Sequence, residues 1–299
     1  MLKSKYLMML PDFLTLYDES TKKLTGIPFC LDLPKKKKLN LVKLSEFIEK
    51  GVTEEEIDLK EQFDDLENII IPDIFIKEGK VKLRNIIDKV QIHEDTLLGN
   101  ITVDNLVYLY YRDKIIVVVQ TSRHKFQIIQ NSKGDRYFII FFCPRTKYKR
   151  CYHFLKNILI KFGLSLSPCI LNPKQIEEIR TEVSGDLLDT TLINFPSTTI
   201  DKKRIMGKGF QTDPEYLKDA KIGSVHQHMF DFKPVYSEVP FVVTVSGDGL
   251  IRFYNKINYD TFFYFIRNHV LDKLRRSVDT AAPLIGFFME DLFEEEDEV

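Results

Sequence analysis

Two stretches of the chain share one pattern of apolar and polar positions. Residues 239–276 place two short apolar runs, FVVTV and LIRFY, on either side of a Ser-Gly-Asp-Gly turn, and a helical apolar stripe begins at about Tyr259. Residues 106–162 have the same plan, with four β-rich runs before a helical stripe. Short runs joined by tight turns are typical of antiparallel strands. The pattern predicts an α+β fold of two antiparallel β-meander units, each followed by a long amphipathic helix packed on the sheet.

The first meander is predicted from the runs LVYLYYR, KIIVVVQT, FQIIQ and RYFIIFF. They are joined by Arg112-Asp113, by the basic residues 122–125, and by a turn in which Gly134 can adopt positive φ. Connections this short cannot cross over to parallel neighbours, so the strands are expected to be antiparallel. Residues 148–162 follow as the helix, and Gly163 ends it.

Capping residues, prolines and apolar spacing predict the remaining helices and strands. Residues 41–52 carry a helical apolar stripe, and Thr53 before three glutamates predicts the N-cap of a further helix that runs to about residue 67. Pro173 and Pro214 each predict the first residue of a helix. Strands are predicted at residues 187–195, 204–210 and 224–232. Residues 80–90 fit a strand or a helix equally well.

Length and composition are those of a globular protein. The chain has 299 residues, of which 44% are hydrophobic and 29% charged, and its formal net charge is −1. This length predicts roughly two domains. The density of proline and serine near residues 163–173 places the boundary there. We therefore predict an N-terminal α+β domain at residues 1–165, a C-terminal α+β domain at 166–289, and a mobile acidic tail at 290–299.

Targeting signals and cysteines bear on the compartment. No segment has the roughly 18 uninterrupted apolar residues of a membrane-spanning helix, and no signal-peptide cleavage pattern follows the N-terminus. The cysteines are too few and too irregularly spaced for a disulfide framework. They are Cys30, Cys143, Cys151 and Cys169. We expect reduced thiols in a cytoplasmic protein, or a nuclear one in a eukaryote, without a membrane partner or a cofactor.

Basic residues interleaved with aromatic ones form the main candidate site. Four consecutive lysines follow Pro34, and residues 122–125 and 145–153 add further basic positions. Arginine and lysine contact phosphates, and tyrosine stacks on bases. The candidate nucleic-acid-binding residues are Lys35, Lys36, Lys37, Lys38, Arg123, Lys125, Arg145, Lys147, Lys149 and Arg150. The alternative is a solvated basic helix end, since the charge of the whole chain is balanced.

His226 and His228 are the metal-ligand candidates. They lie two apart on a predicted strand, so both project from one face. Zinc takes three or four ligands, so the pair needs a further group such as Asp231. Packed histidines on a sheet face are the alternative interpretation. Elsewhere Cys151 and His153 diverge on one helix and cannot form a catalytic dyad.

These observations favour a non-enzymatic intracellular binding protein that associates with nucleic acid or a nucleoprotein assembly. The alternative is a protein–protein interaction or scaffold subunit that uses an open sheet face or an edge strand. A homo-oligomer is a further candidate assembly. A second alternative is a metal- or ligand-binding enzyme or sensor built around His226 and His228. The positions of the two basic loops discriminate between the first two hypotheses. Loops that converge on one face favour nucleic acid, and loops that diverge favour the scaffold.

Overall fold

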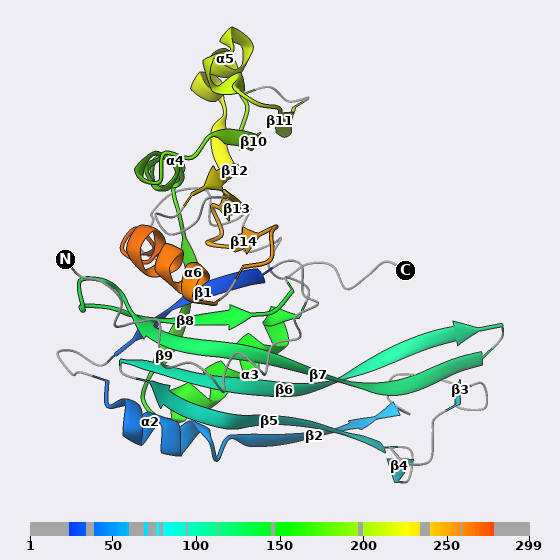
Figure 1. Ribbon diagram of the computed structural model, residues 1–299. Helices are drawn as coiled ribbons and strands as arrows, with labels where there is room; N and C mark the ends of the chain where they lie inside the picture. The colour runs from blue at the N-terminus through cyan, green and yellow to red at the C-terminus, as the bar shows by residue number, and fades with distance from the viewer. Residues whose placement is uncertain are drawn as a thin grey trace. The chain divides into compact units, whose positions relative to one another are not determined.

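The computed structural model divides into two compact units (Figure 1). Residues 27–130 and 134–167 form one, which we call the ribbon unit, and residues 1–26, 131–133 and 168–299 form the other, which we call the histidine unit. The structure describes residues 24–33, 39–59, 69–70, 76–77, 80–93, 95–112, 114–144, 147–196, 200–233, 240–257 and 259–277. The predicted acidic tail, residues 290–299, lies outside them. The predicted division into domains 1–165 and 166–289 stays a prediction.

The ribbon unit is built on an antiparallel sheet in the order β1-β8-β7-β6-β5-β2. The strands are β1 (Leu24–Asp32), β2 (Val52–Asp58), β5 (Lys80–His93), β6 (Thr96–Tyr111), β7 (Lys114–Gln130) and β8 (Tyr137–Phe142). Two short strands, β3 (Ile69–Ile70) and β4 (Ile76–Lys77), pair with β7 and β5. β6 and β7 pair from Leu97–Ile128 to Tyr111–Lys114 and form the long ribbon visible in Figure 1.

Two helices belong to the ribbon unit, α2 (Leu41–Ile48) and α3 (Tyr148–Lys161). The side chain of Asn40 caps α2 by accepting a hydrogen bond from the Lys43 N–H at 3.0 Å. α3 buries its apolar stripe, and Tyr152 stacks on Phe29 of β1 with ring centroids 4.7 Å apart. Gly163 follows with φ of 82°. The predicted helix and the glycine that ends it are confirmed.

The histidine unit contains antiparallel strands in the order β11-β10-β12-β13-β14. They are β10 (Leu187–Ile193), β11 (Lys202–Met206), β12 (Ser224–Phe232), β13 (Phe241–Ser246) and β14 (Ile251–Phe253). β9 (Ser165–Ile170), of which residues 168–170 belong to this unit, pairs with β15 (Arg275–Arg276). The helices are α4 (Pro173–Glu182), the 3-10 helix η3 (Phe210–Thr212), α5 (Pro214–Ile222), α6 (Tyr259–Phe265) and the π-helical turn η4 (Ile266–Val270).

Phenylalanines form the core of the histidine unit. Phe265 of α6 is fully buried, and its ring meets those of Phe232 at 4.9 Å and Phe253 at 5.4 Å. Edge-to-face rings add to the energy of apolar burial. Phe262 packs on Phe253 from one turn earlier in the helix. The aromatic stripe after Tyr259 is therefore core.

The predicted plan of two meanders, each followed by a long helix, is wrong. β10 lies between β11 and β12, so these strands are not a simple meander. β1 pairs through residues 24–26 with β14 and through residues 27–31 with β8, and both partners are distant in sequence. α6 has only 7 residues before the π-helical turn. Apolar runs that are neighbours in the sequence predict hairpins. The sheet is mostly antiparallel, but β1 pairs with strands that are not its neighbours in the chain.

Two local predictions are also wrong. Thr53 does not cap a helix but lies in β2, whose glutamates face the basic residues of β5. Glu56 lies 3.0 Å from Lys80, and these cross-strand charges favour the strand. Residues 122–125 are not a loop but part of β7, where they pair with residues 100–103 of β6. The undecided residues 80–90 lie in β5. Among the described residues, no helix has the length and apolarity to cross a membrane.

Candidate functional site

The basic candidates of the ribbon unit lie on both faces of its sheet. Arg123 and Lys125 alternate along β7 with His124, so they project from the opposite face. Lys147, just before α3, lies near His124, because its charge adds to burial in lowering the pKa of that imidazole. The segment before α3 and the pair Arg123 and Lys125 therefore diverge. Lys35, Lys36, Lys37, Lys38 and Arg145 lie outside the described residues.

Both described arginines among the candidates are bound within the unit. The Arg123 guanidinium pairs with the Asp88 carboxylate across the sheet. Arg150 donates from Nη1 to Asn105 Oδ1 at 3.0 Å, and its Nη2 lies 3.7 Å from Glu55. Bound arginines retain little positive field for a phosphate backbone. This reduces the basic surface that the sequence predicts.

Three lysines remain as a local positive patch. This lysine patch consists of Lys147, Lys149 and Lys156 at and along α3. Burial lowers the pKa of His153, and the positive charges of Lys156 and Lys149 lower it further. The positive potential of the lysine patch therefore extends to this neighbouring imidazole. None of the three forms an ion pair with an acid in the described part of the chain. On the other face, burial lowers the pKa of Lys125 to about 8, and Arg123 and Lys89 add to the effect.

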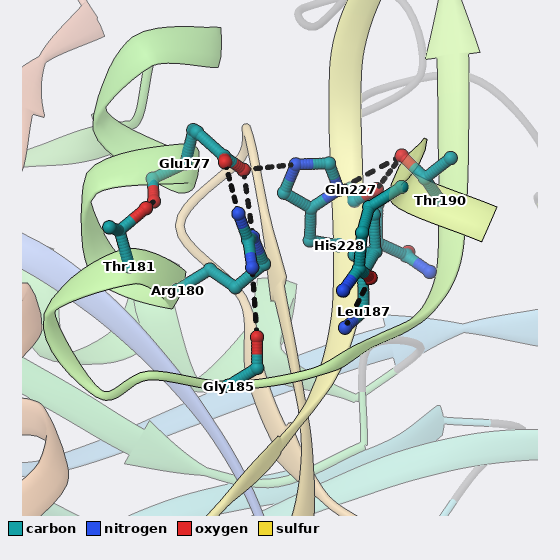
Figure 2. A network of polar contacts seen from close by, with 9 residues as sticks. Glu177, Arg180, Thr181, Gly185, Leu187, Thr190, Gln227 and His228 are labelled. Carbon is teal, nitrogen blue, oxygen red and sulfur yellow. Dashed lines mark hydrogen bonds and ion pairs between the residues drawn. The ribbon is translucent and has the colours of Figure 1, made fainter. Parts of the chain in front are cut away.

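His228 lies at the centre of a polar network in the histidine unit (Figure 2). It is 1% exposed, and its Nδ1 lies 2.9 Å from Thr190 Oγ1 of β10. Its Nε2 lies 3.1 Å from Glu177 Oε2 of α4. Arg180, one turn further along α4, donates from Nε to the same carboxylate at 3.0 Å and from Nη1 to the Gly185 carbonyl at 2.9 Å. The network links α4 to two neighbouring strands.

Glu177 is the charged centre of this network. Burial raises the pKa of Glu177, but hydrogen bonds from Arg180 and His228 outweigh it and lower the pKa to about 2. The carboxylate is therefore ionised at neutral pH and accepts a hydrogen bond from the N–H at His228 Nε2. A carboxylate that fixes one nitrogen of a histidine also fixes its ring orientation.

Thr190, His228 and Glu177 place a hydroxyl, an imidazole and a carboxylate in the order of a nucleophilic triad. Their burial, however, does not suit catalysis. Thr190 and His228 are both buried, whereas a nucleophile must meet its substrate. Both nitrogens of His228 have hydrogen-bond partners, which leaves neither to bind a metal. Asp231, the suggested third ligand, accepts instead from the Asp186 N–H at 2.6 Å. The described residues contain no group of three or more metal-ligating side chains placed to hold an ion. The network is a structural link.

The β6–β7 ribbon presents the feature that sequence reasoning did not single out. The pairing of β5 with β6 ends at Asn85–Val103. Nearer its N-terminus, at residues 80–81, β5 pairs with β4. Over the rest of β6, β7 is the strand partner within the described residues. Here Leu109 is 50% exposed and Tyr110 is 77% exposed. We call residues 105–111 the ribbon edge.

A small apolar cluster supports the ribbon edge. Its buried members are Leu59, Val81, Leu83 and Val117. Leu106 and Tyr108 of β6 pack against it, together with Ile115 and Val119 of β7. The base of the ribbon edge is therefore anchored, while Leu109 and Tyr110 are presented to solvent.

The terminal strands of both sheets differ from the ribbon edge in charge. β2 has Glu54, Glu55 and Glu56 in a row, and β11 begins Lys202, Lys203, Arg204. Charged residues on an edge strand oppose the addition of further strands. Residues 105–111 carry no charge. The available signal was the run LVYLYY, which is apolar on both faces of the strand.

Comparisons with known proteins give no assignment. No protein-family model matches the chain, and no curated protein is significantly similar to it in sequence. The function is therefore argued from the chemistry of its own surfaces.

Proposed function

We propose that the protein is a protein-interaction subunit that binds a strand of a partner polypeptide along the ribbon edge. The observation that carries the proposal is the uncharged segment 105–111 of β6, which pairs with β7 on one side and contains the exposed Leu109 and Tyr110. In strand addition, backbone groups supply the hydrogen bonds and alternate side chains supply the specificity. Tyrosine is also enriched at the energetic centres of protein interfaces.

The supporting structure favours tight binding. β7 pairs with β6 on its inner side, and the apolar cluster below holds Leu106 and Tyr108. An edge that is already extended loses little conformational entropy when a partner strand adds to it. The divergence of the basic groups also favours this function over nucleic-acid binding.

A selection from random extended peptides displayed on phage tests the proposal. We expect enriched peptides to alternate apolar and polar residues and to bind the full chain at least about tenfold more weakly after Leu109→Lys, a loss of about 1.4 kcal/mol. Leu217→Lys is the matched control, because Leu217 of α5 is 46% exposed and lies in the other unit. Failure to enrich any peptide, or equal affinity for both variants, would contradict the proposal.

The lysine patch favours a second function, the binding of nucleic acid. Lys147, Lys149 and Lys156 form a cationic surface whose field acts on the neighbouring histidines. Binding carried by lysine–phosphate contacts weakens with salt, with a slope of roughly one per contact. A mobility-shift series with duplex DNA and single-stranded RNA should show binding at low salt that Lys149→Glu with Lys156→Glu weakens at least about tenfold. Lys174→Glu, an exposed lysine of α4, is the control, and absence of binding at low salt would exclude this function.

A further inference from the structure

We infer that one face of the ribbon unit's sheet binds a small α-hydroxycarboxylate, whose carboxylate pairs with Lys125 and whose hydroxyl donates to Gln127. The site goes beyond the proposed function, because it lies outside residues 105–111 and takes a small molecule. It is formed by β5, β6 and β7. We call its polar side chains the Lys125 cluster, which consists of Asp88, Asn100, Arg123, Lys125 and Gln127.

The register of three strands brings the Lys125 cluster together. Asn100 of β6 lies opposite Asp88 of β5 on one side and opposite Lys125 of β7 on the other. Residues directly opposite each other in an antiparallel pair project from the same face of the sheet. Arg123 and Gln127 lie two residues to either side of Lys125 on β7, so they share that face. Five polar side chains that are distant in sequence therefore gather on one face.

Two oxygens of the cluster lack a hydrogen-bond donor. Gln127 is 4% exposed, and within the described residues its Oε1 is buried and accepts no hydrogen bond. Asp88 Oδ2 accepts from Arg123, but Asp88 Oδ1 is also buried without a donor there. Asn100, between the two strands that carry them, is 3% exposed. Buried acceptors are normally satisfied, so these oxygens indicate a ligand that donates hydrogen bonds.

The charges of the cluster favour an anion. Asp88 is balanced by its ion pair with Arg123, which leaves the charges of Lys125 and Lys89 in excess. Burial, together with the positive charges of Arg123 and Lys89, lowers the pKa of Lys125 to about 8. An anion beside this ammonium would oppose both effects and stabilise its protonated form. Lys89 lies where β5 shifts register, with φ of 51°, and such bulges are frequent next to functional sites.

The ligand must therefore combine a negative charge for Lys125 with a donor for Gln127. These residues lie two apart on one strand, so their Cα atoms are about 6.5–7 Å apart and one small molecule can reach both side chains. An α-amino acid suits the site less well, because its ammonium would lie beside Lys125 and Arg123. A phosphate dianion has no donor and would bring a second negative charge close to Asp88. A hydroxyl next to a carboxylate meets both requirements.

Saturation-transfer NMR on the full chain at pH 7 tests the site with glycolate, L-lactate and D-lactate. We expect at least one of them to bind, and propionate, which lacks the hydroxyl, to bind at least about tenfold more weakly than that acid. Lys125→Met and Gln127→Leu should each weaken binding at least about tenfold. Lys174→Met is the matched control and should leave binding unchanged, because Lys174 is an exposed lysine of α4 in the other unit.

The pH profile separates a direct contact from loss of folding. The anion binds the protonated form of Lys125, so affinity should fall about tenfold between pH 7 and pH 9. Lys125→Arg keeps the charge at both pH values and should bind without this fall. Failure of all three acids to bind at about 50 mM, or equal binding of propionate, would overturn the inference. Either result would leave the proposed function intact, because peptide binding and its loss on Leu109→Lys are measured independently.

Discussion

Replacing Glu177 by glutamine removes the charge at the centre of the histidine network but nearly conserves its shape. The pKa of Glu177 falls from an ordinary 4.5 to about 2, which corresponds to about 3 kcal/mol in favour of the ionised folded state. The Glu177 side chain is 46% exposed, so solvent screening reduces that figure by roughly half. We expect Glu177→Gln to lower the free energy of unfolding by about 1.5 kcal/mol at pH 7.

The pH dependence of this loss identifies its cause. The folded-state pKa lies below the unfolded value, so the stabilisation is fully present above about pH 4.5 and disappears as the pH falls through about 2. The variant lacks it at every pH. The difference between the two proteins should therefore shrink to less than half of its neutral value at about pH 3.

Urea unfolding followed by circular dichroism at both pH values measures this difference. Glu178→Gln is the matched control, because Glu178 is the next residue of α4 and its carboxylate lies 3.8 Å from the Lys174 ammonium in an exposed i,i+4 pair. We expect the control to change the stability by less than about 0.5 kcal/mol. Equal losses in the two variants, or a Glu177→Gln loss that is the same at both pH values, would refute the reasoning.

Three further predictions follow from packing. Gly99→Ala should lower the free energy of unfolding by about 1–3 kcal/mol in urea, because a Cβ there would lie 2.6 Å from the ring of the buried Phe126. Phe265→Ala should cost about 3–5 kcal/mol in the same assay, whereas Tyr264→Ala, at a side chain that is 42% exposed, should cost far less. All four thiols should resist a disulfide reagent such as DTNB until urea unfolds the chain, since all are buried.

Local elements could be predicted where spacing and capping carry the information. Pro173 begins α4, and Asn172 with Gln175 completes its capping box. Gly134 takes φ of 70° in the turn between β7 and β8, as its sequence context predicts. These features depend on residues within a few positions of one another. Thr53 shows the limit, because acidic residues suit both a helix start and an edge strand, and the basic residues of β5 decide between them.

The contacts of the candidate sites could not be predicted, because their partners are distant in sequence. Two histidines at a spacing of two share a face of β12, but Glu177 and Thr190 decide that His228 is a buried link and not a ligand. Likewise, Arg123 looks like a phosphate contact until Asp88 is placed beside it. Composition tells which residues are charged, whereas the fold decides which of those charges are already paired.

The ribbon edge shows the same limit for the backbone. Hydrophobic periodicity predicts that residues 106–111 form a strand, but it does not tell on which side the described residues provide no partner strand. That depends on β5, which stops pairing with β6 at Val103 and pairs with β4 further along. An uncharged open edge promotes aggregation, and the terminal strands β2 and β11 avoid this with rows of charge. Among the described residues, the segment 105–111 lacks such charges, which supports the proposal that a partner strand binds there.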